Sequence, residues 1–204
     1  MKWHETNLEM PERPLPVRIY GDPVLRQKSK PVGEITPAIR ELARRMIVTM
    51  HDTVGIGLAA PQVGVNLRLI TVYTYDDERP IPPDASEGER VLGPRMPLAL
   101  LNPRILEVSA ETSVFEEGCL SLPGIHGEVV RPNALFLEAQ LLNGDGIRLE
   151  CGGLLARCLF HEIDHLDGVL FVDRMAPEEA ARLAPKLKSL KKRRNRRRGV
   201  PAAS

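Results

Sequence analysis

Two histidines and a glutamate lie close together late in the chain, in the sequence His161-Glu162-Ile163-Asp164-His165. On a helix, positions i and i+4 share one face and lie one turn apart, so both imidazoles can bind the same metal ion. Glu162 is one step around the helix from His161, and a general base must be within hydrogen-bond reach of the proton it takes. This spacing favours metal-dependent hydrolysis.

The alternative is that these are ordinary helix residues, as a single histidine in a helix commonly is. The chain has only five histidines, and two of them fall in this pentapeptide with a glutamate between them. The segment from Leu154 onward is otherwise apolar, and burying two imidazoles and two carboxylates without a function costs free energy. We therefore favour the metal-binding interpretation.

Two histidines do not complete a catalytic metal site, because such sites commonly use three protein ligands and leave one position for water. A thiolate from Cys119, upstream of the helix, would be a good soft ligand for a divalent transition metal. Carboxylates downstream of the helix are the other source of a third ligand: Asp167, Asp173, Glu178 and Glu179. At this point the residues alone leave both sources open.

Three helices are expected to position these groups. Thr36 and Pro37 form a typical helix start, with Thr36 as N-cap, and apolar residues then recur at helical spacing until about Asp52. Residues 154–165 form a second helix that is apolar on most sides, as expected for a buried central helix. A last helix begins around Pro177.

Strands are expected between these helices. Asn143-Gly-Asp-Gly146 is typical of a hairpin turn between two strands. Segments 55–64 and 76–97 are expected to be loops, because they are rich in glycine, proline or charge. One α+β domain is the simplest interpretation, with strand candidates at 17–20, 67–73, 98–101, 104–108, 135–142 and 147–151.

Composition limits the classes of protein that fit. The 204 residues are 43% hydrophobic and 27% charged, with a net charge of +1, an ordinary globular balance. The three cysteines, Cys119, Cys151 and Cys158, do not form the even framework of a secreted disulfide scaffold. The N-terminus lacks the apolar core of a signal peptide, and no apolar run is long enough to span a membrane. A cytoplasmic protein is expected, without a membrane partner.

Three motifs occur in order along the chain: Gly55-Ile-Gly-Leu-Ala-Ala-Pro-Gln62, Glu117-Gly-Cys-Leu-Ser121 and His161-Glu-Ile-Asp-His165. Together they resemble the peptide deformylase family, and the resemblance covers roughly Val17 to Arg174. It implies a hydrolase that removes the N-formyl group from the first methionine of new polypeptides and releases formate. It also implies an α+β fold, with antiparallel or mixed sheets packed around a central metal-binding helix and further helices near both termini.

The resemblance also implies roles for the motif residues. Cys119, His161 and His165 would bind one divalent ion, most often ferrous iron, although zinc, nickel or cobalt also suit such ligands. Glu162 would take a proton from the attacking water and pass it to the leaving amine. The Gln62 side-chain amide and the Leu120 backbone N–H would stabilise the developing oxyanion.

An apolar pocket is needed for the methionine side chain. Leu154, Cys158 and His161 share one helix face, and Ile56 is a further candidate for the pocket wall. Gly57 would let its backbone come close to the substrate. For each residue of the pocket wall, plain core packing is an equally good interpretation, and for Gly57 the alternative is a plain glycine turn.

Some positions depart from the family pattern or have a second interpretation. Arg157 lies where the family often has an apolar residue near the pocket rim, and Gly124-Ile-His126 also differs. Both departures concern substrate preference rather than the reaction. Glu117 is expected to pair with Arg131, either as the family does or as a plain surface pair.

The chain is expected to comprise an N-terminal arm (1–16), a catalytic domain (17–185) and a basic C-terminal tail (186–204). Nine lysines and arginines lie between Lys186 and Arg198, without an acidic residue. The tail could be a solvated, frayed helix end followed by disorder at 199–204. It could equally contact ribosomal RNA phosphates, because the substrates emerge from the ribosome.

Three rival functions follow from the same residues. A general metalloprotease would share the histidine helix, but it would not need Cys119 or Gln62. A non-catalytic RNA-binding module is suggested only by the basic tail, and it would need neither a metal nor Glu162. A deformylase-like relative with altered substrate choice would be expected to depart from the three motifs, which are intact here.

Overall fold

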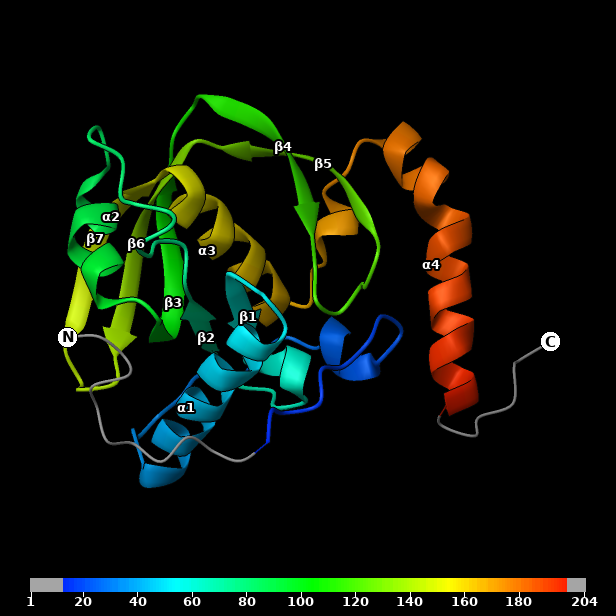
Figure 1. Ribbon diagram of the computed structural model, residues 1–204, viewed down its shortest axis with the longest axis horizontal. Coiled ribbons are helices and arrows are strands. Elements are labelled where there is room, and N and C mark those ends of the chain that lie inside the picture. Colours follow the sequence, from blue (N-terminus) through cyan, green and yellow to red (C-terminus); the bar gives the residue numbers. More distant parts are fainter. Residues whose placement is uncertain (1–12, 198–204) are drawn as a thin grey trace.

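A computed structural model describes residues 13–197 of the chain (Figure 1). The strands are β1 (Gly57–Ala59), β2 (Leu69–Val72), β3 (Leu98–Val108), β4 (Thr112–Gly118), β5 (His126–Pro132), β6 (Ala134–Leu141) and β7 (Gly146–Gly152). The helices are α1 (Pro37–Asp52), α2 (Glu87–Leu92), α3 (Gly153–Leu166) and α4 (Pro177–Arg197). Short 3-10 turns complete the order: η2 (Pro23–Arg26), η3 (Ala60–Val63), η4 (Gly93–Arg95) and η5 (Phe171–Asp173).

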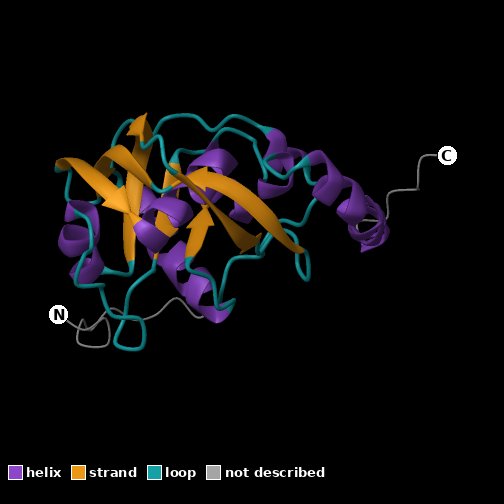
Figure 2. Ribbon diagram, turned by 90° about the horizontal axis from the view of Figure 1, so that it is seen from above, coloured by secondary structure: helices purple, strands orange, loops and turns teal. Residues whose placement is uncertain are grey.

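Five strands form one antiparallel sheet in the order β1-β2-β3-β6-β7, and β4 and β5 form a separate two-stranded ribbon. Strand β1 lies at one edge of the sheet and β7 at the other. Figure 1 shows α3 between the sheet and the ribbon, with α4 beyond the ribbon. The view in Figure 2 shows α4 extending away from the rest of the molecule at one end.

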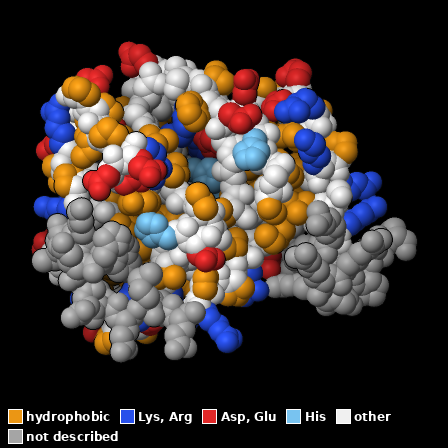
Figure 3. All heavy atoms as spheres, in the orientation of Figure 1, with side chains coloured by type: hydrophobic (Ala, Val, Ile, Leu, Met, Phe, Trp, Pro, Cys, Tyr) orange, Lys and Arg blue, Asp and Glu red, His pale blue; other side chains and the backbone are white. Residues whose placement is uncertain are grey.

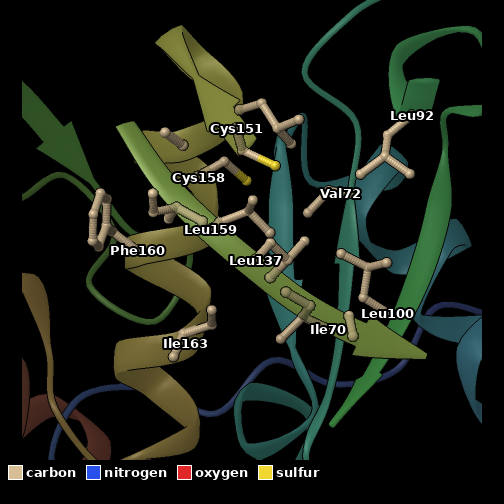
Figure 4. Packing of buried hydrophobic residues seen from close by; sticks show 14 of the residues in the cluster. Ile70, Val72, Leu92, Leu100, Leu137, Cys151, Cys158, Leu159, Phe160 and Ile163 are labelled. Atoms are coloured by element: carbon tan, nitrogen blue, oxygen red, sulfur yellow. The ribbon is translucent and has the colours of Figure 1, made fainter. Parts of the chain in front are cut away.

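Alternate residues of the central strands enter two different cores, because successive side chains of a strand point to opposite faces. Ile70, Val72 and Leu100 pack in the same cluster as α3. Figure 4 shows these side chains opposite Leu159 and Ile163 of α3. Leu69 and Leu101 point the other way, into a cluster with residues of α1. The sheet is therefore covered by α1 on one face and by α3 on the other.

A third cluster anchors α4. Ala180, Leu183, Leu187 and Leu190 recur along one stripe of the helix and pack in a cluster that contains buried Phe171. The stripe extends past residue 186, so α4 remains in contact with the body well into the basic segment. Among the described residues, no helix is both long and apolar enough to cross a lipid bilayer.

The main helices and the hairpin agree with the sequence predictions, and the α+β class is confirmed. Helix α1 begins at Pro37, with the Thr36 side chain accepting a hydrogen bond from the Ile39 backbone N–H, and ends at Asp52. Strands β6 and β7 flank the expected turn, α3 covers the metal-binding motif, and α4 begins at Pro177. The structure describes only part of the expected N-terminal arm, and the disorder expected at 199–204 lies outside the described residues.

Several expectations about local structure were wrong. Residues 17–20 form no strand, because their backbone makes single bonds to two different segments: Arg18 N to Gln62 O at 2.6 Å and Tyr20 N to Ser121 O at 2.8 Å. The expected loop at 55–64 contains β1, paired with β2, and the turn η3. The glycines and alanines there carry little strand propensity, so pairing with β2 decides the conformation.

The expected loop at 76–97 also contains a helix, α2. The Ser86 hydroxyl accepts a hydrogen bond from the Glu89 backbone N–H, and the Glu89 carboxylate accepts one from the Ser86 N–H at 2.7 Å. This reciprocal capping was readable in the sequence as Ser-x-x-Glu. The two strands expected at 98–101 and 104–108 are one strand with a register shift between Leu101 and Arg104. The ribbon strands β4 and β5 were not predicted.

Replacing Leu100, which is fully buried between the sheet and α3, with alanine should lower the free energy of unfolding by about 2–5 kcal/mol. The loss combines the transfer term of the deleted methyl groups with the cavity left behind. Urea unfolding followed by circular dichroism measures it. Leu106→Ala is the matched control, because Leu106 is 39% exposed and its loss should cost less than about 1 kcal/mol. Equal losses would contradict the two-faced core described above.

Candidate metal centre and active site

Cys119 lies next to the two histidines of α3, although it is 42 positions before His161 in the sequence. One ligand atom from each of Cys119, His161 and His165 lies within 4.8 Å of the others, and Cys119 Sγ is 3.2 Å from His165 Nε2. Of the two sources of a third ligand that the sequence left open, the structure thus brings the thiol to the histidines. Of the downstream acids, Asp173 pairs with Arg26 and Asp167 with Arg68.

The turn after β4 fixes the position of the thiol. Register pairing holds Gly118 opposite His126, so residues 119–125 form a tight connection between the two ribbon strands. Within it, Leu122 N donates to Cys119 O at 2.9 Å, and Leu122 is fully buried. The thiol is therefore held by backbone bonds and by core packing.

The orientation of His161 is set by Glu117. The imidazole Nδ1 lies 2.9 Å from the Glu117 carboxylate, which leaves Nε2 for a metal ion. Burial would raise the pKa of Glu117, but hydrogen bonds from His161 and Arg131 lower it to about 2. Burial would likewise lower the pKa of His161, yet its contacts with Cys119 and Glu117 raise it well above the usual value. Glu117 is therefore a fixed anion behind this histidine.

A chain of buried charges extends from Glu117 to the far side of α3. Arg131 contacts both Glu117 oxygens, at 2.6 and 2.9 Å, and donates to Asp164 at 2.8 Å. Asp164 in turn accepts from Arg174 at 2.7 Å. The predicted Glu117–Arg131 pair is confirmed, and since both side chains are only 5% exposed it is not a surface pair. These charges join β4, β5 and α3.

Glu162 is buried and lies next to Gly57 in β1. Its Oε2 has no hydrogen-bond partner among the described residues. Burial raises the pKa of this carboxyl to about 7, against the lowering effect of His161. A carboxyl that titrates near neutral pH can both accept and return a proton, as a general acid–base group must.

The side chain of Gln62 is held in place by a hydrogen bond to its amide oxygen. Its Oε1 accepts from Ala59 N at 2.7 Å, so its Nε2 points toward Ser121 Oγ, at 3.3 Å, and Cys119 Sγ, at 3.5 Å. The amide N–H group therefore faces the metal-binding cluster. Leu120 follows Cys119 directly and lines the same cleft.

These groups line a cleft of about 630 Å³. Figure 3 shows this hollow in the surface, with a histidine side chain at its floor and hydrophobic side chains around it. The predicted pocket residues all line it, namely Ile56, Gly57, Leu154 and Cys158, as do Gln62, Cys119, Leu120, His161 and Glu162. His165 completes the cluster from one helical turn further along α3.

Arg157 explains one of the departures seen in the sequence. Its guanidinium donates to Glu117 at 3.1 Å and to the Val129 carbonyl at 3.2 Å, and it lies over the Phe115 ring at 5.4 Å. The charged end is therefore used to tie α3 to the ribbon. Sequence reasoning missed this role, and it also missed Phe115 and Asp164, since the ribbon itself was not predicted.

The residues present fit a resident metal ion. A thiolate and two imidazoles suit ferrous iron or zinc. Burial and the nearby His161 charge lower the pKa of His165 well below its usual value. The buried Nδ1 of His165 has no partner among the described residues.

Replacing Arg131 with methionine should lower the free energy of unfolding by up to about 3–5 kcal/mol, because buried Glu117 and Asp164 would lose the cation between them and keep only Arg157 and Arg174. Chemical denaturation of both proteins measures the difference. The matched control is Arg148→Met, since Arg148 is 69% exposed and solvent screens its pair with Glu138, so its loss should leave the stability nearly unchanged. A stable Arg131→Met protein would show that the buried chain of charges is dispensable.

Comparison with known proteins identifies relatives over most of the chain. A family model described as polypeptide deformylase matches residues 14–181. Peptide deformylase 2 of Gloeobacter violaceus is 48% identical over 174 residues, covering 85% of this chain and 84% of the relative. The peptide deformylase of Rhizobium meliloti is 47% identical over 158 residues, covering 78% and 83%.

Solved structures agree with the sequence relatives. A plant peptide deformylase superposes with a TM-score of 0.79 at 36% identity, covering 94% of this chain and 96% of the other. The enzyme from Thermotoga maritima superposes with a TM-score of 0.68 at 38% identity, covering 81% and 99%. The chain therefore belongs to the polypeptide deformylase family, the hydrolases that remove the N-formyl group from new polypeptides.

Proposed function

We propose that the cleft beside α3 carries out the deformylation, with Cys119, His161 and His165 holding one divalent metal ion. The observation that carries the proposal is the convergence of these three ligand atoms within 4.8 Å of one another, next to a buried carboxyl. The family favours ferrous iron for this ion, and zinc, nickel and cobalt are alternatives for the same ligands. When bound, the ion would lower the pKa of a water and polarise the formyl carbonyl.

Glu162 is the proton-handling residue in this proposal. Its carboxylate takes a proton from the water that attacks the formyl carbon and passes it to the departing amine nitrogen, so formate and a free N-terminal amine result. The pKa of about 7 suits both halves of this transfer. The buried position, beside Gly57 and without a hydrogen-bond partner on Oε2 among the described residues, leaves an oxygen available for that proton.

Gln62 and Leu120 are the proposed oxyanion donors. The Gln62 amide is held in place before substrate arrives, because Ala59 N fixes its oxygen. Preorganised donors stabilise developing charge without reorganising during the reaction. Leu120 presents its backbone from a turn that is fixed on both sides by Cys119 and Leu122.

The methionine side chain is proposed to enter the cleft along Ile56, Leu154 and Cys158. Leu154 and Cys158 are one turn apart on α3, and both line the cleft with Ile56. The absence of a Cβ at Gly57 keeps this wall open, since an added Cβ would be 2.7 Å from Cys158 Sγ. We also infer that the protein acts in the cytoplasm, where formylated polypeptides are made.

Replacing Glu162 with glutamine should lower kcat for formyl-Met-Ala-Ser by at least about 100-fold, because the amide cannot accept the proton. Formate release from anaerobically purified protein gives the rate, and metal analysis of the same preparation identifies the native ion. The metal content should stay unchanged, since Glu162 is not one of the three ligands. Glu150→Gln, at an exposed position on β7, is the control. Full activity of Glu162→Gln would remove this mechanism.

We propose in addition that the basic tail contacts ribosomal RNA. The last apolar residue of the stripe on α4 is Leu190, and seven of the nine lysines and arginines of the tail follow it in the sequence. Contacts with phosphates are electrostatic and weaken steeply with salt.

The expected division into an arm, a catalytic domain (17–185) and this tail also remains a proposal.

A chain ending at Lys192 keeps the apolar stripe and loses the arginine-rich segment. It should pellet with ribosomes less than the intact chain at about 50 mM salt, and both should be released as salt rises to about 200 mM. Its rate on a free formylated tripeptide, the internal control, should equal that of the intact chain. Equal pelleting of the two proteins would end the docking proposal.

A further inference from the structure

Val54 has a backbone conformation that its side chain disfavours. Two non-glycine residues of the described chain have a positive φ, Val54 at 55° and Asn102 at 50°. A branched Cβ makes this left-handed region a genuine outlier for valine, whereas asparagine tolerates it. The Asn102 side chain moreover bonds both the N–H and the carbonyl of Val32, each at 2.8 Å, which accounts for that position.

The cause of the conformation is the end of α1. Thr53 caps the helix, Val54 N donates to His51 O at 3.0 Å, and Gly55 N donates to Met50 O at 2.8 Å. These two bonds form a Schellman motif, in which the residue after the cap adopts the left-handed conformation and is usually glycine. This motif therefore favours glycine at position 54, where the chain has valine.

Packing does not explain the valine either. Its side chain is 92% exposed, the most exposed of the large hydrophobic residues described. Strained residues that nothing in the core requires are concentrated at functional sites. Val54 lines the active-site cleft, so the site is where a reason for it should be sought.

Val54 lies on the cleft lining beside the edge strand β1, where an extended substrate would run. The catalytic groups lie deep, with Gly57 next to Glu162, and Val54 is three residues before Gly57 at the mouth. Strand β1 is an edge strand, so an extended chain can run beside this segment. An extended chain rises about 3.4 Å per residue, so a substrate whose formyl group is at Glu162 reaches Val54 with its second or third residue.

The opposite wall has a matching apolar surface. Phe115 lines the same cleft and is 57% exposed, with its ring fixed under the Arg157 guanidinium. We propose that Val54 is a specificity-determining residue, whose exposed isopropyl group contacts the second or third side chain of the substrate and favours aliphatic residues there. The proposal rests on the proposed function of the cleft.

The test compares kcat/KM for formyl-Met-Ala-Leu with that for formyl-Met-Ala-Gly, and for formyl-Met-Leu-Ala with formyl-Met-Gly-Ala. The intact protein should prefer leucine in at least one pair, and Val54→Gly and Val54→Asn should each reduce that preference about fivefold. Asparagine is included because it tolerates the left-handed backbone, which separates loss of the apolar group from a gain in flexibility. Val108→Asn, 53% exposed on β3 and outside the cleft lining, should keep the preference.

Thermal unfolding gives a second readout. Val54→Gly should raise Tm, because glycine adopts the required conformation without strain, while the leucine preference falls. An unchanged preference in both Val54 variants would overturn the proposal, and so would a sharp drop in Tm with Val54→Gly, which would make the valine structural. Failure of the intact protein to release formate from any of these peptides would instead contradict the proposed function.

Discussion

The ribbon β4–β5 is held against α3 by buried charge, and the active site exists only while that contact is made. Arg131 lies between Glu117 of the ribbon and Asp164 of the helix, and Arg157 reaches from the helix to Glu117 and the Val129 carbonyl. The sulfur of Cys119 comes from the ribbon and both imidazoles from the helix. If the two elements separated, the three ligand atoms would no longer meet.

Burying these charges between the ribbon and α3 costs free energy, and this explains why each charge is so completely paired. Each buried ion loses its hydration, and this loss is recovered only where hydrogen bonds satisfy the group fully. Glu117 accepts from Arg131, Arg157 and His161, so its oxygens are fully used. The cluster therefore gives up some stability in return for a defined geometry. That geometry includes which imidazole nitrogen of His161 faces the metal-binding position.

Sequence reasoning identified the residues that meet at the candidate site, and it predicted the scaffold less completely. The spacing of His161 and His165 needs only the repeat of a helix, so it was readable locally, and Thr36-Pro37 marked the start of α1 for the same reason. Cys119 could be assigned only through the family resemblance, because its distance from the helix is set by tertiary packing. Strands β4 and β5 were missed because they form a separate ribbon, with Val114, Phe115 and Val130 exposed. The turn near Val54 was missed because its bonds depend on where α1 ends.

Two buried carboxyl groups interact with His161, and their surroundings give them opposite behaviour at neutral pH. Glu117 has a pKa of about 2 and stays ionised. Glu162 is buried, its Oε2 has no hydrogen-bond partner among the described residues, and its pKa is about 7. On the proposed mechanism, Glu162 alone of these two carboxyl groups exchanges a proton. Because Glu117 stays ionised at neutral pH, its ion pairs with Arg131 and Arg157 would persist while Glu162 changes its protonation state.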